Sequence, residues 1–221
     1  MDGMENTEWL LERAGYLTAS RAEEACKRLK SGAKAASYES LMEKVICERV
    51  TGEPIVTPAT PAMQWGKEHE EEAAEAVELA LGQMLTGDGE TFVRHPDVEW
   101  LGASPDRFLG DASLVEIKCP STMTHLGRVM TGAIPAQYQR QMDVQLLCTG
   151  RRRCLFADYD PRLVGTEFGK AALWTQWYEP DAARLGETLA LCREFLADAA
   201  ERIEKFKESI SISMESIHGE F

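Results

Sequence analysis

Length, composition and charge narrow the class of protein first. The 221 residues can bury one sizeable hydrophobic core, and 44% hydrophobic with 28% charged residues is typical of a globular domain. The formal net charge of −13 disfavours loose binding to nucleic acid, although a chain can be acidic outside and basic along one groove. No apolar run approaches the roughly 20 residues that cross a bilayer, so we expect no membrane partner.

The cysteines and the first residues indicate the compartment. The six cysteines are scattered without a CxxC pair, which argues against a zinc site or a disulfide framework and suits a reducing cytosol. The first ten residues, MDGMENTEWL, lack the basic and apolar regions of a secretory signal. His69-Glu70 begins like a zinc-protease HExxH motif, but Ala73 stands where the second histidine belongs. We therefore expect a cytoplasmic protein that is not a zinc protease.

Local sequence signals predict both helices and strands. Ser20 and Glu23 form a capping-box pattern at a helix start, and Gly82 is typical of a helix end. Such signals and the apolar periodicity predict helices over residues 21–30, 38–50, 63–81, 135–148 and 180–207. Short apolar runs between turn residues predict strands over residues 91–94, 98–103, 106–109, 114–118, 153–159 and 171–178. The three prolines within residues 54–62 predict a loop.

The order of these elements indicates the fold class. Helices come first, then a meander of strands, then a helix, two strands and a last helix, which predicts a mixed α/β single domain over residues 1–221. Within it we expect an N-terminal helical part, a central core, and a C-terminal helix with a tail. These parts are expected to span residues 1–62, 63–178 and 179–221.

One glutamate of the predicted helix at 63–81 stands apart from its neighbours. With about 100° per residue, Ala73, Ala74 and Val77 fall on the same helix face as Glu70, whereas the other glutamates fall on the opposite side. A carboxylate in an apolar stripe is costly unless it is paired or bound to a metal. Glu70 is therefore a candidate functional residue; the alternative is a glutamate at a helix end that reaches solvent. The remaining glutamates are expected to form a solvated face.

A predicted strand hairpin carries the other charged candidates. Glu116 and Lys118 alternate with apolar residues and so share one strand face. Asp106, on the preceding strand, faces the same way if it stands directly opposite Glu116. That pairing requires a loop with an odd number of residues, such as 110–112. The apolar content of the strands favours a central position in the sheet, so two carboxylates and a lysine would converge.

Converging carboxylates with few soft ligands suit a hard cation. Oxygen ligands from Asp106, Glu116 and Glu70 fit Mg²⁺ best, with Mn²⁺ as a substitute. A lysine at position 118 could orient or deprotonate a water molecule whose pKa the metal lowers. These parts together predict phosphodiester hydrolysis.

Six ordered segments carry a family resemblance. They are Trp9 to Ser20 (WLLERAGYLTAS), Trp65-Gly66-Lys67 with Glu70, Ser104-Pro105-Asp106, Glu116-Ile117-Lys118-Cys119-Pro120, Tyr138 with Gln141, and Ala157-Asp158-Tyr159-Asp160-Pro161-Arg162. The third and fourth segments look like the PD-(D/E)XK nuclease motif. Together the six resemble the lambda-exonuclease-like, YqaJ-type viral recombinase family. The resemblance implies a restriction-endonuclease-like core, in which helices flank a central mixed sheet.

For the metal site, the resemblance implies a role for each matching residue. Asp106 and Glu116 would ligate Mg²⁺ directly, and the carbonyl of Ile117 would complete the set. Glu70 would bind a metal ion or its water, and Lys118 would position the nucleophile.

For the surroundings of that site, the resemblance implies further contacts. Gln141 and Tyr138 would lie beside the site, although a tyrosine at this helical spacing is more often core packing. Arg13, Ser20 and Ser104 match positions that hold the phosphate of the DNA 5′ end. A guanidinium fork suits phosphate, and a helix N-terminus at Ser20 favours anions. The alternatives are a surface ion pair for Arg13 and a pure capping role for Ser20.

As a function, the resemblance implies a Mg²⁺-dependent 5′→3′ exonuclease. It would degrade one strand of linear double-stranded DNA and leave 3′ single-stranded overhangs for phage-type recombination by strand annealing. The expected partners are double-stranded DNA ends and a single-strand annealing protein, in a bacterial or phage-infected cytoplasm. The alternatives are another PD-(D/E)XK endonuclease and a non-catalytic DNA-binding relative. The second is disfavoured because all four active-site residues are present.

Charge and resemblance together also predict a homotrimer ring. Long-range repulsion opposes a chain of net charge −13 staying on DNA, whereas a closed ring holds threaded DNA by topology. Arg128 and residues 151–153 would then face the channel or the subunit seam, and the acidic stretches at 67–78 and 180–207 would turn outward. The tail after about Lys205 has no evident counterpart in the family.

Overall fold

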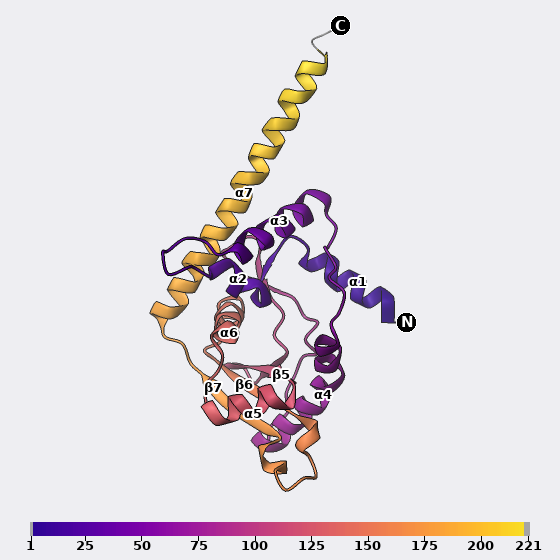
Figure 1. The fold of residues 1–221 in the computed structure, drawn as a ribbon, viewed down its shortest axis with the longest axis vertical. Helices are drawn as coiled ribbons and strands as arrows, with labels where there is room; N and C mark the ends of the chain where they lie inside the picture. Colours follow the sequence, from indigo (N-terminus) through magenta and orange to yellow (C-terminus); the bar gives the residue numbers. More distant parts are fainter. Residues whose placement is uncertain (1, 219–221) are drawn as a thin grey trace.

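The computed structural model describes residues 2–218, with side chains for residues 8–211 (Figure 1). The helices are α1 (Asp2–Arg13), α2 (Ala22–Cys26), α3 (Ala36–Thr51), α4 (Pro61–Leu81), α5 (Thr122–Thr131), α6 (Ala136–Thr149) and α7 (Ala182–His218). The strands are β1 (Leu17–Thr18), β2 (Val93–Arg94), β3 (Leu101–Ala103), β4 (Arg107–Leu109), β5 (Ser113–Lys118), β6 (Arg153–Tyr159) and β7 (Leu173–Tyr178). Short 3-10 helices lie at Ala19–Arg21, Pro161–Leu163 and Gly169–Ala171.

The main sheet has the strand order β4-β5-β6-β7. β5 and β6 are parallel, and the two outer pairs are antiparallel. Phe108 pairs with Leu114 across the β4–β5 hairpin, so residues 110–112 form its loop and Asp106 falls opposite Glu116. The predicted odd-numbered loop and the central position of residues 113–118 are therefore confirmed.

Helices cover both faces of this sheet (Figure 1). On one face, α4 packs Ala73 and Val77 into a buried cluster with residues such as Val115 and Leu155. On the other face, α6 packs Met142 into a cluster with Leu114, Phe156 and other apolar residues. Successive residues of a strand point to opposite faces, so Leu114 and Glu116 share the α6 face. The mixed α/β single-domain fold predicted from the sequence is confirmed.

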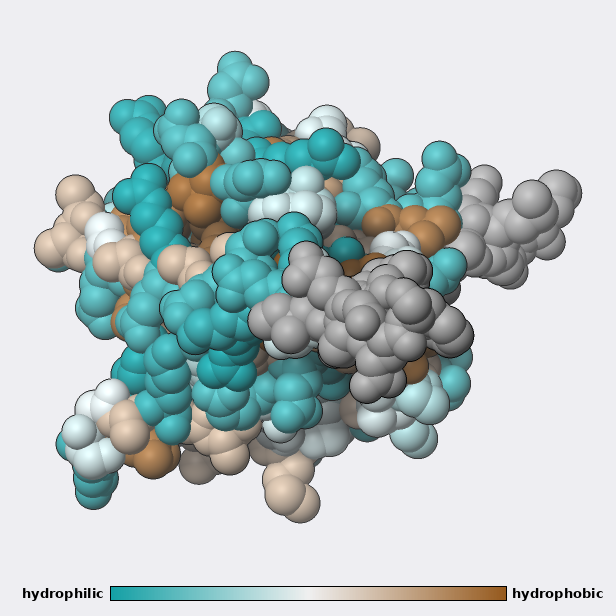
Figure 2. Space-filling model, turned by 90° about the horizontal axis from the view of Figure 1, so that it is seen from above, coloured by the Kyte–Doolittle hydropathy of each residue, from teal (hydrophilic) through white to brown (hydrophobic). Residues whose placement is uncertain are grey.

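A second, smaller layer holds the N-terminal helices and the long C-terminal helix together. Its three-stranded sheet has the order β1-β3-β2, and β1 runs parallel to β3. Tyr38 of α3 and Phe195 of α7 are fully buried in its core, with ring centroids 5.0 Å apart. Beyond this core, α7 continues as a single helix away from the body (Figure 1). The face seen along that direction is largely hydrophilic, with small separate hydrophobic patches (Figure 2).

Several predicted elements are shorter in the structure, and two of them have a clear local reason. The helix expected over residues 21–30 is α2, which ends at Cys26, because Lys27 is extended and Arg28 bridges to Lys34 in a hairpin-like loop. The strand expected over residues 98–103 begins only at Leu101, since the preceding Trp100 has a φ of 65°. Two helices, α1 and α5, were not predicted, although Ser121 caps α5 and a glycine ends it.

The predicted capping role of Ser20 is wrong. Ser20 lies inside the 3-10 helix Ala19–Arg21, and α2 begins after Arg21 without a side-chain cap. The Ser20 hydroxyl instead lies 3.2 Å from the hydroxyl of Thr18. Among the helices described, none is long and apolar enough to cross a membrane.

Asp198 of α7 is expected to make stability depend on pH. Although burial opposes its charge, hydrogen bonds from Lys34, Arg202 and Tyr38 hold its pKa at about 2. A lowered carboxyl pKa adds stability above the unfolded value near about 4, and that stability is lost as the pH falls towards about 2. We expect Asp198→Asn to lower the free energy of unfolding by about 1–2 kcal/mol at pH 7. The difference from wild type should shrink below about pH 4 in urea unfolding curves; a difference that is constant with pH would contradict this role.

Candidate active site

Three charged side chains meet where β4 begins and β5 ends. Oδ2 of Asp106 accepts a hydrogen bond from the backbone N–H of Ile117 at 2.7 Å, which ties the two strands together. Nζ of Lys118 lies 3.9 Å from the same carboxylate and forms an ion pair with Glu116. The structure thus brings Asp106, Glu116 and Lys118 together as the sequence predicts.

Glu116 is fully buried and held by two glutamines of α6. Nε2 of Gln141 donates to Oε1 of Glu116, and Nε2 of Gln145 donates to Oε2, both at 2.6 Å. Burial, and then the nearby Asp106 carboxylate, raise the pKa of Glu116 to about 7 against the opposing effect of Lys118. Gln145 was not among the residues predicted for the site. Its contact with Glu116 follows from the packing of α6 on β5.

Lys118 is a cation in this environment. Burial lowers its pKa, but the carboxylates of Glu116 and Asp106 outweigh burial and raise the pKa above its ordinary value. The ammonium therefore donates protons in hydrogen bonds and is poorly suited to act as a base. Its Nζ lies 5.4 Å from the ring centroid of Tyr138, so the structure places Tyr138 beside the site as well.

Glu70 reaches the site from α4 but is paired there with an arginine. Nη1 of Arg107 donates to Oε1 of Glu70 at 2.9 Å, and Nη2 donates to Glu71 at 2.7 Å. Arg107 is almost fully buried, and nothing in the sequence marked it. Burial, and then the charge of Asp106, raise the pKa of Glu70, against the opposing Arg107. Glu70 is thus coupled to Asp106 by charge, as a member of the same site would be.

The residues of this site fit a hard divalent cation. Besides burial, the charge of Asp106 raises the pKa of both Glu70 and Glu116, so a cation bound near these carboxylates would relieve their repulsion. Gly89 lies close to this group, because a Cβ there would lie 3.4 Å from Oε1 of Glu70 and 3.9 Å from Cα of Asp106. Within the described part of the chain, no three acidic, histidine or cysteine side chains already converge as a metal-binding group. Lys118 and Arg107 take up that negative charge instead.

The three residues expected at the DNA 5′ end are partly assembled. Nη1 of Arg13 lies 3.4 Å from Oγ of Ser104, two residues before Asp106. The guanidinium stacks on Trp9 at 3.9 Å, and burial, followed by repulsion from Arg21, lowers the pKa of Arg13 to about 10. Ser20 follows β1, which pairs with β3, and Ser104 follows β3. The described contact of the Ser20 side chain, however, is with Thr18.

The remaining basic residues lie in two different places. Residues 151–153 lie at the start of β6, where Arg153 pairs with Ser113, at the opposite end of the strand from Lys118. Arg128 of α5 lies at the site end, where it forms an ion pair with Asp158 of β6. Of the four basic residues expected to face the channel, Arg128 is therefore the one that adjoins the candidate active site.

A mixed sheet flanked by helices, with Asp106 opposite Glu116 and Lys118 on the same strand face, has the arrangement of the PD-(D/E)XK nuclease class. The family comparison makes the assignment narrower. The profile of the YqaJ-like viral recombinase domain matches residues 8–152, and the chain belongs to this family.

Solved structures agree with this assignment. The chain is similar to an alkaline exonuclease (LHK-Exo) from Laribacter hongkongensis, with a TM-score of 0.83 and 35% sequence identity over 92% of this chain and 97% of that one. The same enzyme in complex with dAMP matches equally well. A phage-related exonuclease from Haemophilus somnus 129PT shares the fold, with a TM-score of 0.70 and 14% identity over 94% of this chain and all of that one. A comparison with curated proteins gives no match.

Proposed function

We propose that the protein is a Mg²⁺-dependent 5′→3′ exonuclease that degrades one strand of linear double-stranded DNA and leaves 3′ single-stranded overhangs. Membership of the YqaJ-like viral recombinase family and the similarity to an alkaline exonuclease support the nuclease role. The observation that supports the direction of attack is the contact of Arg13 with Ser104, because a guanidinium there could bind a terminal phosphate two residues along the chain from Asp106. The overhangs would serve recombination through a single-strand annealing protein, in the cytoplasm of a bacterium or phage-infected cell.

The side chains of the site would have different roles in hydrolysis. Asp106 and Glu116, with the Ile117 carbonyl, would hold Mg²⁺, and Glu70 would bind the ion or its water once released from Arg107. Bound there, Mg²⁺ or Mn²⁺ would supply a lowered water pKa and charge stabilisation of the phosphate. Gln141 and Gln145 fix the orientation of Glu116, and Lys118 orients the attacking water as a hydrogen-bond donor.

Arg13→Ala is expected to remove the preference for a phosphorylated 5′ end. In the wild-type chain, charge-assisted hydrogen bonds to a terminal phosphate should place the first phosphodiester bond at Asp106 and Glu116. The variant should degrade 5′-phosphorylated linear duplexes at least about tenfold more slowly and leave 5′-hydroxyl duplexes little changed. The measurement is the release of nucleotides from matched duplexes that differ only in the 5′ phosphate.

A matched control for this substitution is Arg94→Ala. Arg94 is an exposed arginine of the same layer that pairs with Glu12 and is not part of the proposed pocket. Arg94→Ala should leave the degradation rates of the 5′-phosphorylated and the 5′-hydroxyl duplex unchanged. Equal slowing of phosphorylated and hydroxyl ends by Arg13→Ala would exclude the phosphate pocket.

A homotrimer ring is part of the proposal and is supported by charge. DNA repels a chain of net charge −13. A closed ring of three copies would hold a threaded duplex by topology despite this repulsion. Light scattering should give about 74 kDa, three times the 24.6 kDa chain, and digestion should resist a DNA trap added after loading. A stable monomer at micromolar concentration, whose digestion stops at once with the trap, would contradict the ring.

A different PD-(D/E)XK endonuclease is the second candidate, and closed circular DNA distinguishes the two. An exonuclease that needs an end leaves a closed circle intact, whereas an endonuclease converts it to linear or nicked forms.

A further inference from the structure

Two buried ionisable residues lie beside the Lys118 end of the site and have no role so far. His125 of α5 and Asp158 of β6 are both fully buried. In the parallel register of β5 and β6, Asp158 is the direct neighbour of Lys118, so the two side chains stand on the same sheet face. Charged groups this deep are costly unless they are paired and hydrogen-bonded, so their partners define what they do.

His125 is held in place by two hydrogen-bond partners. Nδ1 lies 2.5 Å from Oδ1 of Asp158, and Nε2 lies 2.6 Å from the carbonyl oxygen of Ala171. A carbonyl oxygen can only accept, so Nε2 donates to Ala171, and the contact of Nδ1 fixes Oδ1 of Asp158 in place.

The second carboxylate oxygen of Asp158 is connected to the active site through Arg128 and Tyr138. Oδ2 accepts a hydrogen bond from Arg128, and Nη2 of Arg128 lies 3.3 Å from the hydroxyl of Tyr138. The Tyr138 ring contacts two cations, with its centroid 5.1 Å from the Arg128 guanidinium and 5.4 Å from Nζ of Lys118. A continuous chain of contacts thus runs from His125 to Lys118.

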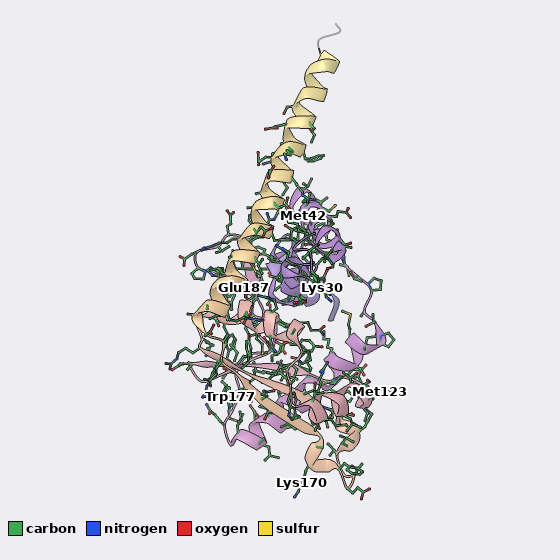
Figure 3. All side chains as sticks on the ribbon, turned by 60° about the vertical axis from the view of Figure 1, so that its left-hand side comes forward. Lys30, Met42, Met123, Lys170, Trp177 and Glu187 are labelled. Carbon is green, nitrogen blue, oxygen red and sulfur yellow. The ribbon has the colours of Figure 1, made fainter. Side chains whose placement is uncertain are left out.

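The orientation of α5 shows that this chain of contacts, rather than apolar packing, holds the helix. Its inward side carries His125 and Arg128, whereas Met123 and Met130 are 86% and 85% exposed. Met123 stands at the outer edge of the molecule in Figure 3, away from the sheet. An amphipathic helix normally buries its apolar side, so the reversal indicates that the buried ionic contacts anchor α5.

We propose that His125, Asp158 and Arg128 are positioning residues that hold Tyr138 against Lys118 and so fix the Lys118 ammonium at the reaction site. This inference rests on the proposed nuclease function. It assigns a purpose to Tyr138 and Arg128: the ring packs against the Lys118 ammonium, and Arg128 keeps that ring in place.

A double-variant cycle with Arg128→Gln and His125→Gln tests the proposal. Each variant should lower kcat at least about tenfold, because a small displacement of a reacting group is costly, and leave the Kd for a duplex within about twofold. The double variant should lose no more than the larger single loss, since both residues act through one path. Arg202→Gln, which breaks an ion pair on α7 far from the site, is the matched control and should keep kcat.

A second measurement follows the position of Lys118 without any cleavage. The ¹³C-dimethylated Lys118 resonance, assigned by its loss in Lys118→Arg, should show a ring-current shift from Tyr138. That shift should shrink in both variants and vanish in Tyr138→Leu. If His125→Gln does not fold, Tyr138→Phe replaces it in the cycle, because it removes only the hydroxyl that Arg128 contacts.

The remaining outcomes would overturn the proposal. Losses of kcat that multiply in the double variant would show independent roles. A Kd that weakens in step with kcat would make Arg128 a DNA contact, and a lowered Tm with unchanged kcat would make the network only structural. If the wild-type protein did not cleave linear duplex DNA, the proposed function would be refuted. An unchanged Lys118 resonance in the variants would refute the positioning network alone.

Discussion

Asp106→Ala or Glu116→Ala should each reduce cleavage of linear duplex DNA by about three orders of magnitude or more, while the fold survives. The physical reason is that a metal-bound phosphate transition state gains several kcal/mol from the ion, and each kcal/mol is worth roughly a factor of five in rate. The Asp106 side chain accepts one described hydrogen bond within the fold, from the N–H of Ile117, so its removal is tolerable. Glu116 is buried against Lys118, so Glu116→Gln is the gentler companion variant.

The control for these variants is Asp111→Ala. Asp111 is an exposed carboxylate in the loop of the same β4–β5 hairpin, and its replacement should leave the rate unchanged. Rates are measured as nucleotide release with Mg²⁺, and circular dichroism checks the fold. Full activity in the Asp106 or the Glu116 variant would remove that residue from the site.

Lys118→Ala should lower kcat by about 10²-fold to 10⁴-fold and leave DNA binding nearly unchanged. One charge among many phosphate contacts adds little to affinity, whereas the ammonium that orients the attacking water is needed in every turnover. Lys118→Met, which keeps most of the length of the side chain, should be as inactive as the alanine variant. Binding is measured by fluorescence anisotropy without divalent cation.

The control for Lys118 is Lys67→Ala, which removes an exposed lysine of α4. Lys67→Ala should change neither kcat nor the affinity for DNA. If Lys118→Ala lost affinity in proportion to kcat, Lys118 would belong to the substrate grip, and another group would have to orient the water.

The charged core of the site could be predicted because it depends on short-range periodicity. The alternation along residues 113–118 places Glu116 and Lys118 on one face, and the odd-numbered loop at 110–112 sets Asp106 opposite Glu116. Both rules act within one hairpin, so no knowledge of the rest of the fold was needed. The strand over residues 153–159 was predicted with its observed bounds for the same reason.

The contacts made by Arg107 and by His125 could not be predicted, because each contact joins segments that are distant in the sequence. Arg107 reaches Glu70 across the packing of α4 on the sheet, and a lone arginine in a strand carries no signal of burial. His125 and Asp158 are 33 positions apart and meet only after α5 docks on β6. The missed helix α5 itself carries its apolar residues outside, so the usual periodicity argument fails for it.

Glu70 illustrates how a correct periodicity leaves a role open. Its helix face was predicted, and its neighbours Ala73, Ala74 and Val77 are buried as expected. The side chain, however, is 32% exposed and paired with Arg107, which satisfies a partly buried carboxylate without a metal. Whether Glu70 serves the ion therefore depends on its release from Arg107, and its metal role stays a prediction.

The most direct test of the proposed activity uses one linear duplex with a 5′ phosphate on the strand to be degraded and separate labels on its two ends. A closed circle of the same DNA serves as control, and both are incubated with Mg²⁺ and then with EDTA. We predict stepwise loss of nucleotides from the 5′ end, an intact complementary 3′-ended strand, an uncut circle, and no reaction with EDTA. Cleavage of the circle, loss of the 3′ end first, or full activity in EDTA would contradict the proposed metal-dependent 5′→3′ exonuclease.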